Sequence, residues 1–132
     1  MAESELYRKG AAMRRQLMGE AEVERLGRTT YGDPVMKKFL DVATETVFGA
    51  LWTRPGLDRR SRSLVTLGAL IALRAGEELK FHFPIALRNG LTAEELEEVV
   101  YHLTGYVGFP AATLASNVGR EVLPQPDRQS GG

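Results

Sequence analysis

Apolar residues recur along this chain at spacings of three and four, which is the repeat of amphipathic helices. Apolar and polar residues seldom alternate at a spacing of two, so the pattern predicts helices rather than a sheet. We therefore expect an all-α fold of six or seven helices. The predicted helices cover roughly residues 4–18, 20–27, 34–50, 59–74, 76–89, 92–105 and 110–123.

Capping residues mark several of the predicted helix ends. Asp33 precedes Pro34, which is the usual order of an N-cap and a first helical residue. Thr92 and Glu95 have the spacing of a capping box. Pro84 falls inside the fifth predicted helix, where it removes one backbone hydrogen bond, so we expect a kink or a break there.

The length of 132 residues is that of a single domain. We predict one domain over residues 1–123, followed by a polar, disordered tail over 124–132. The longest apolar run, 64–73, would rise only ~15 Å as a helix, about half of a bilayer core, so we expect no membrane span. The N-terminus has no apolar run before a cleavage site, and we expect a cytoplasmic protein.

The composition narrows the possible functions. Seventeen basic and seventeen acidic residues give a net charge of zero, so no basic excess points to nucleic acid. The absence of cysteine excludes disulfides, thiolate metal ligands and cysteine nucleophiles. The helices over 64–73 and 96–107 have more apolar surface than a small bundle needs, which predicts a homo-oligomer.

The two histidines are the first candidates for chemistry. Glu78 and His82 are four residues apart on one predicted helix, so they share a face. A carboxylate beside an imidazole holds its tautomer and favours its protonated form, as a general acid or base requires. The alternative is an ordinary surface pair worth ~0.3–0.5 kcal/mol. His102 borders an apolar face, where a core or interface histidine is the alternative. Two histidines are too few for a zinc site, so we expect no metal.

Arginines gather where a helix begins. Arg59, Arg60 and Arg62 lie in the first turn of a predicted helix, where the helix dipole disfavours cations. Either they form a solvated, ion-paired face, or they bind an anion.

Three stretches of the chain together form a recognisable pattern. They are YRKGAAMRRQLMG, ALWTRPGLDRRSRSLVTLGALIAL and EELKFHFPIALRNGLTAEELEEVVYHLTGYVGFPAA. Over roughly residues 5–123 the chain resembles the carboxymuconolactone decarboxylase family, in particular its small 4-carboxymuconolactone decarboxylase type. The resemblance implies an alkylhydroperoxidase D-like, all-α fold that assembles into homotrimers or homohexamers.

The resemblance also implies a reaction. Proteins of this type remove CO2 from 4-carboxymuconolactone, a small dicarboxylate lactone, giving 3-oxoadipate enol-lactone in aromatic catabolism (the β-ketoadipate pathway). The lactone carbonyl accepts the electrons that CO2 leaves behind, so no cofactor is required. The peroxidase branch of the superfamily works through a Cys-x-x-Cys pair, and the absence of cysteine excludes that chemistry here.

The family resemblance implies roles for individual residues. His82, oriented by Glu78, would be the proton donor or the oxyanion partner, and His102 is a second candidate. Candidates to bind the substrate carboxylates are Arg59, Arg60, Arg62 and Arg74, and candidate pocket walls are Trp52 and Phe81.

Pro84 departs from the family's regular helix after the histidine, so either the pocket is reshaped for another substrate or the helix absorbs the proline. Two alternatives therefore stay open. One is a non-catalytic oligomeric module that binds a small acidic ligand, and the other is a lyase or isomerase with a different substrate.

Overall fold

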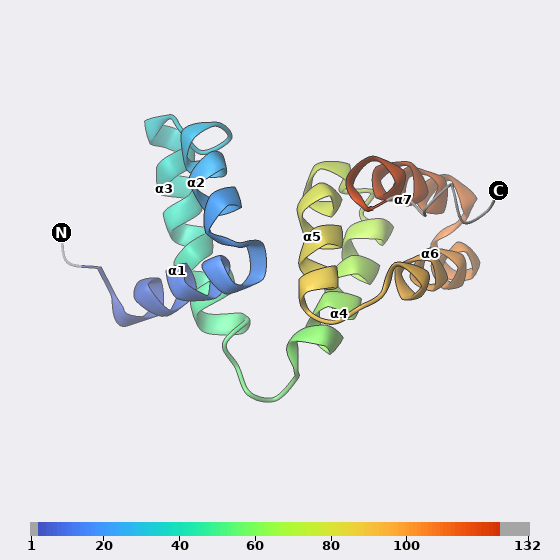
Figure 1. Ribbon diagram of the computed structural model, residues 1–132, viewed down its shortest axis with the longest axis horizontal. Coiled ribbons are helices and arrows are strands. Elements are labelled where there is room, and N and C mark those ends of the chain that lie inside the picture. The colour runs from blue at the N-terminus through green and yellow to red at the C-terminus, as the bar shows by residue number, and fades with distance from the viewer. Residues whose placement is uncertain (1–2, 125–132) are drawn as a thin grey trace. The chain divides into compact units, whose positions relative to one another are not determined.

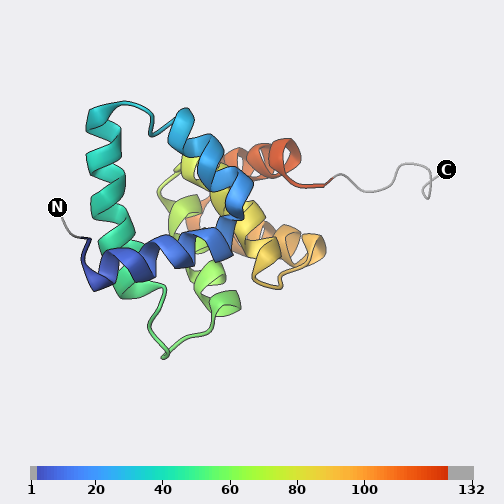
Figure 2. The same cartoon turned by 60° about the vertical axis from the view of Figure 1, so that its left-hand side comes forward.

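The computed structural model describes residues 3–124, and every regular element among them is helical (Figures 1 and 2). This confirms the prediction of an all-α fold. The elements are α1 (Glu5–Met18), α2 (Glu20–Arg28), α3 (Pro34–Ala43), the π-helix η1 (Thr44–Leu51), α4 (Arg59–Ala72), α5 (Gly76–Arg88), α6 (Ala93–Val107) and α7 (Phe109–Val122). The predicted disordered tail lies, beyond Pro124, outside the described residues.

The chain divides into two compact units, with the boundary between Arg59 and Arg60. The first unit contains α1, α2, α3 and η1, and the second contains α5, α6, α7 and nearly all of α4. A single domain over residues 1–123 stays a prediction.

In the first unit, α1 lies across the end of the continuous α3–η1 helix (Figures 1 and 2). Two glycines allow this contact. A Cβ atom on Gly10 would lie 1.9 Å from the carbonyl oxygen of Thr44, and one on Gly49 would lie 2.1 Å from that of Leu6. Because no real Cβ atom tolerates such distances, the two backbones can touch only where both residues are glycine.

The long helix after the Asp33 cap changes type along its length. The Asp33 side chain accepts a hydrogen bond from the Met36 amide at 2.9 Å, and the α-helix then runs to Ala43. From Thr44 onward the helix is a π-helix, in which each amide bonds to the carbonyl five residues earlier. The predicted extent of this helix is confirmed, whereas its π-helical half was not predicted.

The second unit is built around an apolar core. Helix α7 packs on both α5 and α6, and residues from all four helices contribute buried side chains. The core consists of Leu67, Ile71, Leu79, Phe83, Ala86, Leu91, Leu96, Val100, Ala112, Ala115 and Val118. No helix within residues 3–124 combines the length and the apolarity needed to cross a membrane.

Two predictions from the sequence concern this unit, and the structure agrees with only one of them in full. The capping box is present, since the Glu95 amide donates to the Thr92 hydroxyl at 3.1 Å and the Thr92 amide donates to the Glu95 carboxylate at 3.0 Å. Of the kink or break expected at Pro84, the break is wrong, because α5 runs continuously through this residue, and the kink stays a prediction. The neighbours Phe83 and Ile85 are buried, so core packing holds the helix together where one backbone bond is missing.

Candidate functional site

His82 sits on α5, with Glu78 one turn before it. The Nδ1 atom of His82 is buried, whereas Glu78 is exposed near the start of the helix. Burial lowers the pKa of His82 to about 4, and the negative charge of Glu78 opposes this only in part. The expectation that Glu78 makes the protonated form the favoured one is therefore wrong, because desolvation outweighs the carboxylate.

The side chains next to His82 on α5 do not supply a free cation. Lys80 forms ion pairs with Glu77 at 3.3 Å and with Glu121 at 3.7 Å. A hydrogen bond to Glu77 and the charge of Glu121 raise the pKa of Lys80, so its ammonium group stays charged and engaged. Phe81 is half-buried beside the histidine.

A neutral imidazole near pH 7 has defined chemical abilities. One ring nitrogen carries a proton and donates a hydrogen bond, while the other can accept one. A buried donor of this kind is well suited to stabilise an oxyanion, because it acts where water does not screen it. It is poorly suited to start a reaction as an imidazolium acid at neutral pH, since its pKa is about 4.

Arg60 and His102 line a second feature, a cavity of about 480 Å³ between α4 and α6. Arg60 is ion-paired to Glu95, and the cavity is also lined by Glu94 and Glu98. His102 is exposed, and its ring lies 5.0 Å from that of Tyr106. Carboxylates therefore outnumber the arginine around this cavity, which opposes the binding of a dicarboxylate there.

The remaining predicted residues are distributed over both units. In the first unit, Trp52 is buried and Arg59 donates a hydrogen bond to Gln16. In the second, Arg62 is half-buried on α4, and Arg74 is exposed just beyond the helix with a left-handed φ of 57°. Within single units, the structure thus brings together Glu78 with His82, and Arg60 with His102.

Arg14 is a residue that the sequence-based reasoning missed. It lies on α1 with an exposed fraction of 7%, and its guanidinium carbon is 5.9 Å from the centre of the Phe48 ring. A sequence signal was present, because Arg14 is four residues after Gly10 and three before Leu17, and all three are buried on one face. An arginine on the buried face of an amphipathic helix is unusual, because burying its charge is costly unless another group compensates for it.

The residues described by the structure contain no cluster of three or more histidine, aspartate or glutamate side chains that could hold a metal ion.

Comparison with known proteins gives a consistent result. The model of the carboxymuconolactone decarboxylase family matches residues 37–121. The chain is 34% identical over 123 residues to 4-carboxymuconolactone decarboxylase of Acinetobacter baylyi, an alignment that covers 93% of this chain and 90% of the relative. It is 36% identical over 118 residues to nitrosuccinic acid decarboxylase of Metarhizium robertsii, covering 89% and 81%. This chain therefore belongs to the carboxymuconolactone decarboxylase family.

Proposed function

We propose that this protein is a decarboxylase that removes CO2 from 4-carboxymuconolactone or a closely related carboxylated lactone, without a cofactor. Family membership and two similar decarboxylases support the reaction class. The substrates named for those relatives share a chemical feature: each is a small acid with a group, lactone or nitro, that can accept an electron pair.

In the proposed reaction, the bond between the ring carbon and the leaving carboxylate breaks. Its electron pair moves through the unsaturated ring to the lactone carbonyl oxygen, CO2 departs, and a proton is then added to carbon to give the enol-lactone. The protein must hold the acid, stabilise the oxyanion and allow the proton to arrive.

We assign to His82 the stabilisation of the oxyanion that forms on the lactone carbonyl. The observation that carries this assignment is a buried imidazole whose pKa of about 4 keeps it neutral near pH 7. A neutral ring can donate its N–H to the developing charge, and water supplies the proton for carbon. Glu78 is the positioning residue, because its charge acts on the ring from one turn away. Arg62 and Arg74 stay proposed for the substrate carboxylates.

The test is to mix the protein with 4-carboxymuconolactone and follow CO2 release together with loss of the butenolide absorbance. We expect turnover, and we expect His82→Gln to slow it by ~100-fold, as loss of an oxyanion donor does. His102→Gln is the matched control and should stay within a few-fold of the wild type. A folded wild-type protein without turnover would overturn the substrate, and a His82→Gln rate close to wild type would remove His82 from the mechanism.

The pH profile separates the two roles considered for His82. A neutral hydrogen-bond donor predicts a rate that rises through pH 4 and then stays level to pH 7. An imidazolium acid predicts a rate that falls over the same range. Nitrosuccinate is the second substrate to be tested. If the protein converts nitrosuccinate and not the lactone, the proposed decarboxylase activity stands and the proposed substrate class changes.

A further inference from the structure

Arg14 stands apart from the other charged residues. Among residues 3–124 it is the only buried charged side chain, with 7% of its surface exposed. Burial lowers the pKa of Arg14, which means that its charged form is poorly solvated where it lies. A buried charge is costly unless a partner of opposite sign compensates for it.

One aromatic ring lies against this guanidinium, and two tyrosines act on it electrostatically. Phe48 in η1 lies beneath it at 5.9 Å, which is within the range of a cation–π contact. Tyr7 is on the same face of α1, two turns earlier, and Tyr31 is in the turn after α2. Both tyrosines are half-buried, and both interact with Arg14 electrostatically. The first unit therefore places a buried cation against the ring of Phe48.

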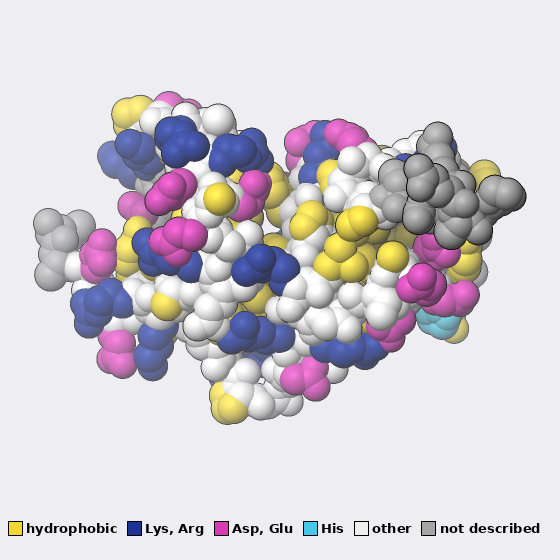
Figure 3. All heavy atoms as spheres, viewed as in Figure 1, with side chains coloured by type: hydrophobic (Ala, Val, Ile, Leu, Met, Phe, Trp, Pro, Cys, Tyr) yellow, Lys and Arg dark blue, Asp and Glu magenta, His cyan; other side chains and the backbone are white. Residues whose placement is uncertain are grey.

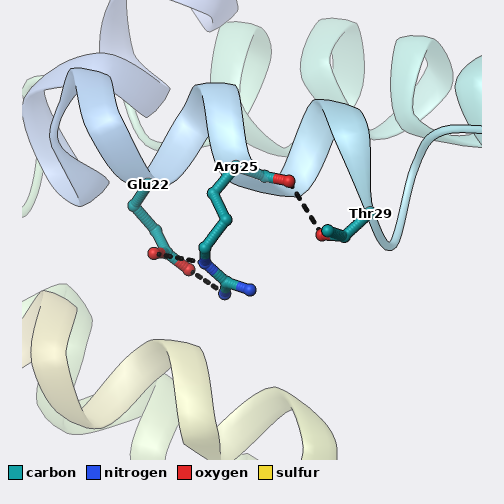
Figure 4. Close-up of polar contacts among 3 residues, drawn as sticks. All are labelled: Glu22, Arg25 and Thr29. Carbon is teal, nitrogen blue, oxygen red and sulfur yellow. Dashed lines mark hydrogen bonds and ion pairs between the residues drawn. The ribbon is translucent and has the colours of Figure 1, made fainter.

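Arg25, an exposed arginine of the same unit, shows what Arg14 lacks. On α2, Arg25 donates two hydrogen bonds to Glu22, at 2.6 and 3.1 Å, and its carbonyl accepts one from Thr29 at 2.8 Å (Figure 4). No carboxylate in the described part of the chain is within 4.0 Å of the Arg14 guanidinium. The exposed arginine has its counter-ion, whereas the buried one does not.

We propose that Arg14 binds a carboxylate group of a flat, unsaturated acid, with the Phe48 ring as one wall of this subsite. A guanidinium matches a carboxylate with two parallel hydrogen bonds, and the bound acid supplies the missing charge. Aromatic rings favour a planar ligand over a flexible one. The identity of the acid as the substrate rests on the proposed function, while carboxylate binding at Arg14 does not.

The test uses furan-2,5-dicarboxylate, a planar diacid that resembles the lactone ring, and the full-length protein. In a titration followed by ¹H–¹⁵N NMR, we expect the assigned Nε–Hε signal of Arg14 to shift in a saturable way. We expect Arg14→Lys to weaken binding by about tenfold, because lysine keeps the positive charge but cannot form the two parallel hydrogen bonds of a guanidinium. The matched control is Arg25→Lys, which should bind within twofold of the wild type. The dimethyl ester of the same diacid, which has no charge, should not bind.

An unmoved Arg14 signal at saturating diacid, or no binding at all, would overturn the inference, and so would an Arg14→Lys affinity equal to that of the wild type. The wild-type titration decides the matter even where the variant does not fold. Binding at Arg14 without decarboxylation would overturn the proposed function and leave this inference in place. Decarboxylation with an unmoved Arg14 signal would overturn this inference and leave the proposed function in place.

Discussion

His82 and Arg14 show that burial, more than residue type, decides what a side chain can do. The sequence placed His82 one turn from Glu78 and suggested a protonated ring, but burial reverses that preference. Arg14 was missed because clustering drew attention to Arg59 and Arg60, which in the structure have protein partners. Spacing along a helix can be read from a sequence, whereas the degree of desolvation depends on packing across the fold.

The lowered pKa of His82 predicts that stability depends on pH. The unfolded chain, with a histidine pKa of 6.5, binds more protons than the folded chain between about pH 4 and 6.5, so stability is complete above pH 6.5 and falls as the pH drops. We expect about 2 kcal/mol of this loss between pH 7 and 5. Urea unfolding at both pH values should show a smaller loss for His82→Gln, by about that amount.

His102→Gln is the control for this measurement, because His102 is exposed. It should keep the pH dependence of the wild type. Equal losses for the wild type and His82→Gln between pH 7 and 5 would contradict the burial of the imidazole.

At the scale of helices, most of the fold could be predicted because the chain marks its helix ends chemically. The hydroxyl of Ser4 caps α1, Asp33 caps α3, and Thr92 caps α6, each by accepting a hydrogen bond from a backbone amide. The π-helix could not be predicted, since a change in the hydrogen-bonding pattern of the backbone leaves no side-chain signature in this sequence. The continuity of α5 through Pro84 likewise depends on the core around it.

The close contact of α1 with η1 predicts a strong effect of one methyl group. Gly10→Ala would place a Cβ atom 1.9 Å from a backbone oxygen of Thr44, and backbone cannot move aside as a side chain can. We expect a loss of about 1–3 kcal/mol or more in the free energy of unfolding, measured in urea.

Gly27→Ala is the matched control, because Gly27 is also helical but exposed, with nothing within 4 Å of its Cβ position. There alanine should leave stability unchanged or raise it by up to ~1 kcal/mol. A Gly10→Ala variant as stable as the wild type would mean that α1 and η1 lie further apart.

At the scale of the whole molecule, both units present large apolar side chains at the surface (Figure 3). In the first unit Val35 is 75% exposed, and in the second Leu73 is 75% and Tyr106 76% exposed. Scattered apolar residues are ordinary on a protein surface, but several large ones on each unit favour contacts between subunits.

We therefore predict a homo-oligomer, and the resemblance to the family implies that it is a trimer or a hexamer. Light scattering behind size exclusion at micromolar concentration should give about three or six times the chain mass of 14.5 kDa. A particle with the mass of one chain would contradict this prediction and leave the exposed apolar side chains without a partner.

The wide turn of η1 affects how members of the family should be aligned. A π-helical turn commonly holds one residue more than an α-helical turn. In a homologue that lacks one residue between Thr44 and Leu51, this turn would close as ordinary α-helix. The parts of the continuous α3–η1 helix before and after it would then be rotated against each other by ~100°. Its counterpart of Phe48 would then leave the guanidinium of Arg14. A single alignment gap at this place would therefore divide the family into proteins with and without an aromatic platform beneath that arginine.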